Sequence, residues 1–424
     1  MTTLLIANGN FFSTFGGGQI YVKNVVDEMI RQQLDIVVFS FVYKKRERII
    51  NKREYKGIPL FEIYQKDKVQ IVELIKNIKP ALIHAHAQKV FFAEICKELN
   101  IPYIVTAHHG GITCPAGALM NAKDEICKIP VSHKDCLACV LKNTKEGLGF
   151  YRLFKYVPLA YRLRWGKFIQ KIPFVYFLTP WCISSLQIEN KRRDWETIIN
   201  YTDMMIAPSQ AIAGNMILNG FSKEKIRIIP HGIATIPCDS PSVRTDSCLK
   251  FFYVGRISYI KGIHKLLQAF IQLDSSKCQL HLVGDLSEKY AKKLQTKYHN
   301  YSNIIFHGKI NPEQVLEYIC NFDVLVHSSI CLEIFGLNIA EALSQNKPVI
   351  ATRCGGAEMQ IQDKKNGLLV EPNNTEAIRK AMQYFIDHPN EIKRMSLNAP
   401  TNIISIEEHV KQLVTTYNNR THEK

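Results

Sequence analysis

The sequence predicts an α/β fold with two doubly wound, Rossmann-like domains, each built around a parallel sheet. Three observations point to this fold class. Short apolar runs alternate with helical patterns along the chain, as in parallel sheets covered by helices on both faces. Glycines follow several apolar runs where a helix is expected to begin. The chain also has 424 residues, which is enough for two domains that each bury a core.

The first domain is expected to span residues 1–235. Ligands of doubly wound sheets bind beyond the carboxyl ends of the strands, so His108, which follows one predicted strand, is a candidate site residue. The predicted strands are residues 4–7, 36–42, 81–86, 103–107, 204–209 and 226–229, and the predicted helices are residues 20–31, 69–79, 90–99 and a helix that ends at residue 219.

Three glycines follow the first predicted strand of this domain. Among them, Gly17 and Gly18 allow a close approach of the backbone and leave amides exposed at the start of a helix, where anions bind. A plain tight turn is the alternative, because glycine-rich loops follow the first strand of most doubly wound folds.

The second domain is expected to span residues 236–404. It begins within residues 234–247, which contain two prolines and several Ser and Asp residues and therefore predict a linker. A strand at residues 249–253 opens the domain. Two later strands end near Gly284 and Lys309, on the same edge of the sheet.

The stretch from Phe322 to Glu371 contains the strongest pattern. It predicts a strand at residues 324–327, a loop at 328–336, and a helix from about residue 337 to 343. The helix opens directly after a glycine, so its first amides are free and its positive dipole end faces the loop. We therefore predict an anion site at the amides of Phe335, Gly336 and Leu337.

Two glutamates flank this helix start, with the spacing E-x7-E. Glu333 precedes the helix and Glu341 lies inside it. One turn or more along the helix, Glu341 is placed to reach the hydroxyls of a sugar that is attached to the anion. A nucleotide fits this description.

The same stretch resembles the donor-binding signature of the family 4 glycosyltransferases. The resemblance is carried by EIFGLNIAEAL at residues 333–343, KPVIA at 347–351, GGA at 355–357 and NGLLV at 366–370. This family retains the configuration of the transferred sugar and has the GT-B fold, in which two doubly wound domains face each other across a cleft. The resemblance implies that the first domain binds the acceptor and the second binds the nucleotide sugar.

Arg256 and Lys261 are the cations to which the resemblance assigns the donor diphosphate. They lie five residues apart on a strand-to-helix turn between Gly255 and Gly262. When the bond from a sugar to a diphosphate breaks, about one extra negative charge develops on the leaving oxygen, and a cation must meet it. No Asp-x-Asp motif ends a predicted strand, so we expect chemistry without a metal ion.

The resemblance also assigns the sugar. Glu333 and His108 would position the transferred sugar, and Glu341 would hold the ribose. His109 departs from the family pattern, which has an aspartate there, so no acceptor role is carried over to it.

Further contacts follow from the same resemblance. The backbone near Lys309 and Ile310 would read the edge of the nucleobase, and Gly255 and Gly284 would border the donor. The final helix, expected within residues 405–424, would pack back on the first domain.

Four cysteines predict a possible metal site in a loop-like segment at residues 110–140. They are Cys114, Cys127, Cys136 and Cys139, and the last two have the two-residue gap that lets both sulfurs reach one ion. Structural zinc, an iron–sulfur cluster and unliganded thiols all remain open. Twelve cysteines without a visible secretory signal indicate a reducing, cytoplasmic location.

The formal net charge of +16 indicates an anionic partner. Residues 150–193 hold nine basic residues against one acid, Glu189, and aromatic residues lie between them. This composition suits the headgroup region of an anionic membrane and would also suit stacking on RNA. No nucleic-acid motif accompanies it, so we expect peripheral attachment to the inner face of a membrane and no nucleic-acid partner.

Together these features predict a retaining glycosyltransferase. Its donor would be a nucleoside diphosphate sugar and its acceptor a lipid-linked or surface glycan. The alternatives are a sugar-nucleotide epimerase or hydrolase of the same fold, a binding module without catalysis, and a basic membrane- or RNA-binding protein.

Overall fold

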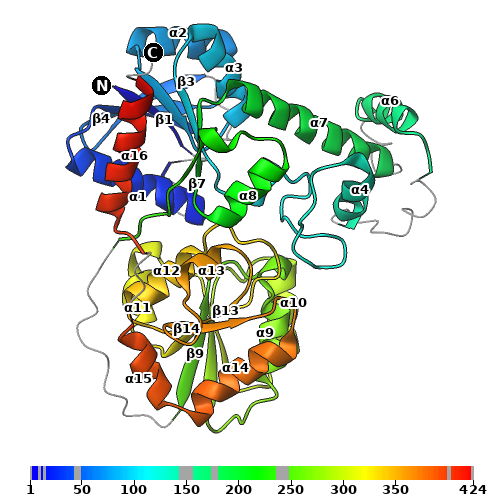
Figure 1. Ribbon diagram of the computed structural model, residues 1–424, viewed down its shortest axis with the longest axis vertical. Helices are drawn as coiled ribbons and strands as arrows, with labels where there is room; N and C mark the ends of the chain where they lie inside the picture. The colour runs from blue at the N-terminus through cyan, green and yellow to red at the C-terminus, as the bar shows by residue number, and fades with distance from the viewer. Residues whose placement is uncertain are drawn as a thin grey trace. The chain divides into compact units, whose positions relative to one another are not determined.

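The computed structural model describes residues 2–7, 11–12, 16–42, 49–142, 156–172, 180–234, 248–398 and 403–421. It contains two compact units, each with its own sheet (Figure 1). The first unit comprises Met1–Lys123, Cys127–Ile229 and Ile406–Lys424, and the second comprises Asp124–Ile126 and Pro230–Ser405. None of the described helices combines the length and the apolar character that a bilayer span requires.

The first unit is built on an eight-stranded sheet. All neighbouring strands in it are parallel except β3 and β4. In spatial order the strands are β3 (Ile50–Tyr55), β4 (Ile58–Ile63), β2 (Ile36–Phe41), β1 (Thr3–Ile6), β5 (Leu82–Ala85), β6 (Tyr103–Thr106), β7 (Met204–Ala207) and β8 (Ile226–Ile228).

The antiparallel pair β3–β4 is a hairpin that the sequence analysis did not anticipate. Its turn consists of Lys56 and Gly57, both with positive φ, which is the geometry of a tight hairpin turn. β3 has the sequence INKREY and lies at the edge of the sheet. Charged side chains are common on edge strands because they prevent pairing with other chains, and here they hid the strand pattern.

One region of the first unit differs from the sequence prediction. The segment at residues 110–140 was expected to be loop-like, but its last part forms a helix. The basic region at 150–193, for which no secondary structure was predicted, holds one helix and most of a second. The helices are α1 (Gly17–Arg31), α2 (Lys68–Ile78), α3 (Lys89–Leu99), η1 (Gly110–Ile112), α4 (His133–Lys142), α6 (Leu159–Ile169), α7 (Pro180–Tyr201), α8 (Gln210–Leu218), η3 (Lys223–Lys225) and α16 (Ile406–Thr421).

The C-terminal helix α16 belongs to the first unit and packs on α1 (Figure 1). Val410, Leu413 and Tyr417 of α16 are buried in the same core as Val22 and Val25 of α1. The last helix of the chain is therefore part of the first unit's hydrophobic core.

The second unit has a six-stranded parallel sheet with helices around it (Figure 1). Its strand order is β11 (Ile304–Gly308), β10 (Cys278–Val283), β9 (Leu249–Val254), β12 (Val324–His327), β13 (Val349–Thr352) and β14 (Gly367–Val370). The helices are η4 (Tyr259–Lys261), α9 (Ile263–Phe270), α10 (Lys289–Lys297), η5 (Pro312–Gln314), α11 (Val315–Ile319), α12 (Leu337–Ser344), α13 (Gly356–Gln360), α14 (Thr375–Asp387) and α15 (Asn390–Ser396).

The order of these strands places the switch point of the second unit between β9 and β12. The chain runs outward in one direction from β9 to β11 and in the other from β12 to β14. Ligands of doubly wound sheets bind beyond the carboxyl ends of the strands at such a point. The loops after Val254 and His327 are therefore the expected ligand-binding loops of this unit.

Candidate active site

The loops that follow β9 and β12 are joined at close range in the second unit. Gly262 has a φ of 66°, and a Cβ there would lie 1.9 Å from the backbone oxygen of Ser328, so only glycine fits. The Ser328 hydroxyl donates to the Lys261 carbonyl at 2.9 Å, and the Ile330 amide donates to the Ile260 carbonyl at 3.0 Å. This contact fixes the position of Lys261 relative to the loop that carries Glu333.

A cluster of three charged or ionisable side chains lies at this junction. The Lys261 ammonium is 2.5 Å from a carboxylate oxygen of Glu333, and Nε2 of His327 is 3.5 Å from the same oxygen. The side chains of Lys261 and Glu333 are 17% and 15% exposed, and that of His327 is 1% exposed. The structure thus brings together two predicted site residues, Lys261 and Glu333.

His327 is a member of this cluster that the sequence analysis missed. It is the last residue of β12, and its Nδ1 lies 3.1 Å from Oδ1 of Asn338. The Asn338 amide in turn donates to the Val254 carbonyl at 2.9 Å. The sequence could have indicated His327 by its position, because it ends a strand at the switch point. Asn338 lies on the other side of the same loop, in the first turn of α12.

The contacts within this cluster favour the ionised forms of both Glu333 and Lys261. Burial favours the neutral form of Glu333, but the charge of Lys261 and the contact with His327 together hold its pKa well below the usual range. Burial also opposes the charge on Lys261, yet Glu333 and the neighbouring Tyr253 raise the pKa of its ammonium above the usual value. Both side chains are charged near neutral pH.

Arg256 is placed differently from Lys261. Its side chain is exposed, and the structure gives it no side-chain hydrogen bond or ion pair with any described residue. Its backbone is held, because the Tyr253 hydroxyl donates to the Arg256 carbonyl at 2.8 Å. A Cβ on Gly284 would lie 2.2 Å from the Gly255 carbonyl, so the loops after β9 and β10 also touch. Arg256 is therefore a cation on a fixed turn that no side chain in the described part of the chain neutralises by an ion pair.

The start of α12 directly follows Gly336, and an anion site at its first amides stays a prediction. Gly336 adopts a left-handed conformation with φ 85°, and no side chain caps the helix. The amides of Ile339 and Ala340 both point to the Gly336 carbonyl, whereas the first helical amides have no intrahelical acceptor. Phe335 is fixed beside this start because its carbonyl accepts a hydrogen bond from Gln360 at 2.5 Å.

Glu341 lies about 6 Å along α12 from Leu337, the first residue of the helix, because an α-helix rises about 1.5 Å per residue. It is half-buried, and the structure shows no hydrogen-bond or ion-pair partner for its carboxylate among the described residues. Burial raises the pKa of this carboxyl to about 7. A half-buried carboxylate in this state is suited to accept hydrogen bonds from ligand hydroxyls.

The remaining predicted donor residues of the second unit lie after β11. Lys309 is exposed, and Ile310 packs against the core cluster on one face of the sheet. Both residues lie directly after the end of a strand, as expected. Their role in recognition of the nucleobase stays a prediction.

In the first unit, His108 lies in a connected group of histidine and tyrosine side chains. Its Nε2 is 2.7 Å from Nδ1 of His86, and its ring centre is 5.1 Å from that of Tyr21. The Tyr21 hydroxyl lies 2.6 Å from Nε2 of His409 on α16. The neighbouring His84 lies 2.6 Å from the Tyr417 hydroxyl through its Nδ1 and 2.7 Å from the Thr106 hydroxyl through its Nε2. Neither His86 nor His409 was identified from the sequence as relevant to His108.

Gly17 and Gly18 begin α1 in the same unit. No side chain caps this helix, and the amides of Gln19 and Ile20 both point to the Gly16 carbonyl. The two glycine amides are therefore in the position that the sequence analysis predicted for an anion site.

The cysteine segment does not show a formed metal centre. Cys114 and Cys136 are buried, and Cys127 and Cys139 are half-buried. Burial, with a smaller contribution from the neighbouring thiols, raises the pKa of Cys136 to about 12. Among the described residues, no group of three or more His, Cys, Asp or Glu side chains is arranged to hold a metal ion. Zinc or an iron–sulfur cluster stays a prediction, which the metal content of the purified protein would test.

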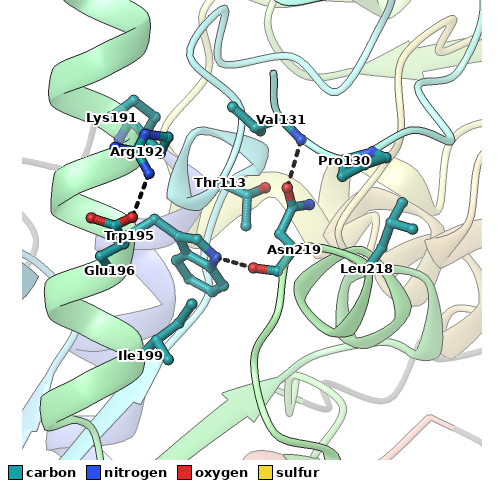
Figure 2. Close-up of a pocket in the computed structure, with 10 residues that line it drawn as sticks. All are labelled: Thr113, Pro130, Val131, Lys191, Arg192, Trp195, Glu196, Ile199, Leu218 and Asn219. Atoms are coloured by element: carbon teal, nitrogen blue, oxygen red, sulfur yellow. Dashed lines mark hydrogen bonds and ion pairs between the residues drawn. The ribbon is translucent and has the colours of Figure 1, made fainter. Parts of the chain in front are cut away.

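A pocket of about 280 Å³ also opens in the first unit, between α7, the end of α8 and the segment that precedes α4 (Figure 2). Trp195 donates from its indole nitrogen to the Asn219 carbonyl at 2.8 Å, and the Val131 amide donates to the Asn219 side chain at 2.8 Å. Lys191 lines the pocket, and its ammonium donates to the carbonyl of Gly111, which lies two residues after His109. The lining is mixed: apolar side chains lie beside Lys191 and beside Arg192, which forms an ion pair with Glu196 at 2.6 Å.

Two family models match the chain. Residues 242–402 match the model for glycosyl transferases group 1, and residues 15–131 match the model for glycosyltransferase family 4. The chain belongs to the family 4 glycosyltransferases. The segments matched include Lys261, Glu333 and Glu341 in one unit and His108 in the other.

Curated relatives of the chain include two sugar transferases of bacteria. The chain is 25% identical over 214 residues to the O-antigen chain mannosyltransferase C of Escherichia coli, covering 48% of this chain and 56% of that protein. It is 26% identical over 189 residues to the D-rhamnosyltransferase WbpZ of Pseudomonas aeruginosa, covering 42% and 48% of the two chains. The chain spans about half the length of the curated relatives it matches.

Solved structures match the chain over nearly its full length. Sucrose-phosphate synthase from Thermosynechococcus elongatus has a TM-score of 0.69 at 18% identity, with 100% of both chains covered. The Anabaena protein HepE in complex with UDP has a TM-score of 0.68 at 17% identity, with 99% of both chains covered. At these identities the likeness shows the fold, which is GT-B as the sequence predicted.

Proposed function

We propose that this protein transfers a sugar from a nucleoside diphosphate sugar to a glycan acceptor, with retention of configuration. The observation that carries the proposal is the junction of the two loops at the switch point. There, the Lys261–Glu333 ion pair lies beside a helix start without a side-chain cap. A diphosphate sugar has the charges and hydroxyls that such a junction binds.

In this proposal the departing diphosphate is stabilised by side-chain cations. Arg256 is exposed and unpaired among the described residues, so it can meet a phosphate without breaking an existing ion pair. Lys261 is already held against Glu333, so it is preorganised and its position does not change when charge develops on the leaving oxygen. These two cations supply charge that many other transferases obtain from a divalent ion, so we propose chemistry without a metal ion.

The sugar itself would be held by carboxylate and imidazole groups. Glu333 lies beside Lys261 and would accept hydrogen bonds from sugar hydroxyls, and Glu341 would accept those of the ribose. His108 from the first unit would contact the transferred sugar. No described side chain pairs a nucleophile with an adjacent base at the Lys261 cluster, so we propose same-face substitution in which the leaving phosphate takes the acceptor proton.

The proposed acceptor is a growing bacterial surface glycan on a lipid carrier. This part rests on the named relatives, which act on O-antigen chains or are rhamnosyltransferases, and on the basic charge of the chain. The enzyme would then work in the cytoplasm, at the inner face of the membrane. The mixed pocket beside α7 lies in the unit to which the acceptor is assigned.

Two measurements test the proposal. First, a thermal-shift screen against UDP, GDP, ADP and CMP sugars should give a rise in melting temperature with one nucleotide class, because a ligand that binds only the folded state stabilises it. Second, NMR of the product formed with a glycan acceptor should show the anomeric configuration of the donor. Inversion would contradict the mechanism.

The same experiments separate the alternatives. An epimerase or hydrolase would consume the donor without acceptor and give free or isomerised sugar nucleotide. A binding module would show the thermal shift without turnover. An RNA-binding protein would bind oligonucleotides with a steep salt dependence that survives replacement of Glu333 and Glu341.

A further inference from the structure

Helix α6 (Leu159–Ile169) presents large aromatic side chains to solvent. Tyr161, Trp165 and Phe168 are 59%, 53% and 58% exposed, and the Trp165 and Phe168 rings contact each other edge to face. On a helix of 3.6 residues per turn, these three positions fall on one stripe. Exposed apolar surface that is gathered in this way marks an interaction site.

Packing against α7 forces this stripe outward. Arg162, Gly166 and Ile169 occupy a different stripe of α6 and are buried. The Arg162 guanidinium donates to the Ser185 hydroxyl of α7 at 3.2 Å, and a Cβ on Gly166 would lie 2.8 Å from the Cys182 carbonyl. Because the glycine lets the two helices approach so closely, α6 cannot rotate to bury its aromatic side chains.

Cations flank the aromatic stripe. Arg164 and Lys167 are exposed and lie on the neighbouring side of the helix, and Lys171 is exposed just beyond its end at Ile169. The sequence from residue 159 to 172 contains no Asp or Glu. The outward face of α6 is therefore aromatic in its centre, basic along one edge and free of carboxylates. We call these six residues the α6 face.

We propose that the α6 face docks on an anionic membrane surface. Aromatic rings of this kind lie at the boundary between headgroups and acyl chains, and Lys and Arg beside them reach the anionic headgroups. The formal net charge of the whole chain is +16, which complements the negative charge of such a surface. This inference deepens the proposed function. It rests on that function in one respect, which is that a lipid-linked acceptor makes membrane attachment useful.

The chain offers a matched control for charge. Helix α10 (Lys289–Lys297) in the second unit exposes Lys289, Lys292 and Lys293 but none of the strongly exposed large apolar side chains that α6 has. The triple variant Arg164→Gln, Lys167→Gln, Lys171→Gln and the triple variant Lys289→Gln, Lys292→Gln, Lys293→Gln remove the same charge from the protein. Only the first removes it from the α6 face.

The test is co-sedimentation of the full chain with vesicles of phosphatidylglycerol and phosphatidylcholine in equal parts. Each basic residue near an anionic surface strengthens partitioning about fivefold. The α6 triple variant is expected to bind about 100-fold more weakly, and the α10 triple variant about as well as the unaltered protein. The aromatic variant Trp165→Ser with Phe168→Ser should lose about tenfold. Equal losses in both triple variants would overturn the proposal in favour of general charge attraction.

A second readout reports the contact itself. Vesicles should shift the tryptophan emission of the unaltered protein to shorter wavelength, and Trp165→Phe should remove that shift while the protein still sediments with vesicles. A shift that persists in Trp165→Phe would overturn the docking of α6, as would a concentration-dependent dimer that Trp165→Ser dissociates, or binding of RNA in preference to vesicles.

These outcomes are distinct from failure of the proposed function. Thermal shifts with nucleotide sugars, measured without vesicles, do not depend on α6 and should be equal in all the variants. Loss of vesicle binding with normal nucleotide-sugar binding would affect only the docking proposal. Normal vesicle binding without any nucleotide-sugar binding would remove only the transferase.

Discussion

The Tyr21 hydroxyl lies 2.6 Å from Nε2 of His409, although 388 residues separate the two in the sequence. Tyr21 is on α1 and His409 on α16, and both side chains are buried. On its other side, the Tyr21 ring contacts the ring of His108. The C-terminal helix therefore supports, through one tyrosine, the histidine that is proposed to meet the sugar.

Removing this hydrogen bond should destabilise the first unit. Tyr21→Phe keeps the ring but leaves His409 buried without this partner, so a loss of about 1–3 kcal/mol in the free energy of unfolding is expected. Urea unfolding of Tyr21→Phe, His409→Phe and the double variant measures the coupling between the two side chains. If the two single losses simply add, the residues do not act as a pair.

Arg256 and Lys261 should differ in their effect on stability but not on turnover. Replacing either by Ala should lower turnover by about 10² to 10³, the usual loss for one charge-stabilising group. Lys261→Ala also leaves Glu333, whose side chain is only 15% exposed, without its ion-pair partner and should cost about 3 kcal/mol of stability. Arg256→Ala, on an exposed side chain, should change stability by less than about 0.5 kcal/mol.

The control for this pair is Lys289→Ala, an exposed lysine elsewhere in the second unit. Steady-state rates and thermal unfolding of the three variants give the comparison. Near-normal turnover in both Arg256→Ala and Lys261→Ala would remove the proposed role of the cations.

Glu333 should make stability depend on pH in the acid range. Its pKa is held below the unfolded value by Lys261 and His327, so the ion pair stabilises the protein fully above a pH of about 4.5 and less as the pH falls below it. Glu333→Gln should therefore be less stable than the unaltered protein at pH 7, and the difference should shrink toward pH 3. A constant difference across this range would show that the carboxylate charge is not responsible.

Glu341 should show the opposite dependence. Burial raises its pKa to about 7, so the folded state binds the proton more tightly than the unfolded state and loses stability as the pH rises from about 4.5 through 7. Glu341→Gln should be about 2 kcal/mol more stable than the unaltered protein at pH 8 and equally stable near pH 4.

The same variant should weaken binding of the nucleotide sugar, because the amide replaces a carboxylate acceptor. Glu317→Gln, on the exposed surface of α11, is the control and should change neither property. A Glu341→Gln protein that binds the donor normally would contradict the ribose contact.

His327 should act by holding Glu333. Its Nδ1 is fixed by Asn338, and its Nε2 faces the shared oxygen of Glu333. His327→Ala should lower kcat about tenfold or more with a smaller change in KM. It should also raise the folded-state pKa of Glu333, and with it the pH at which the acid loss of stability is complete. His327→Asn, which keeps a donor, should recover part of the activity. Equal defects in both variants would indicate packing alone.

The sequence by itself determined the fold class, and it proposed most of the second unit's candidate site residues. Apolar runs followed by glycines predicted the strand-to-helix turns, and Glu333, Gly336 and Glu341 fall in one local stretch. Such patterns are readable because the residues involved are close in sequence and depend on the same loop and helix start.

Other features depended on contacts between distant segments. The hairpin β3–β4 was hidden because charged residues cover an edge strand. His327 joins Glu333 only because β12 ends beside the loop that Asn338 closes. The approach of His409 to Tyr21 and the outward face of α6 follow from helix packing, in which Gly166 and the C-terminal helix decide which side chains are buried. Packing between elements that are far apart in the chain leaves no local periodicity, so only the tertiary structure decided them.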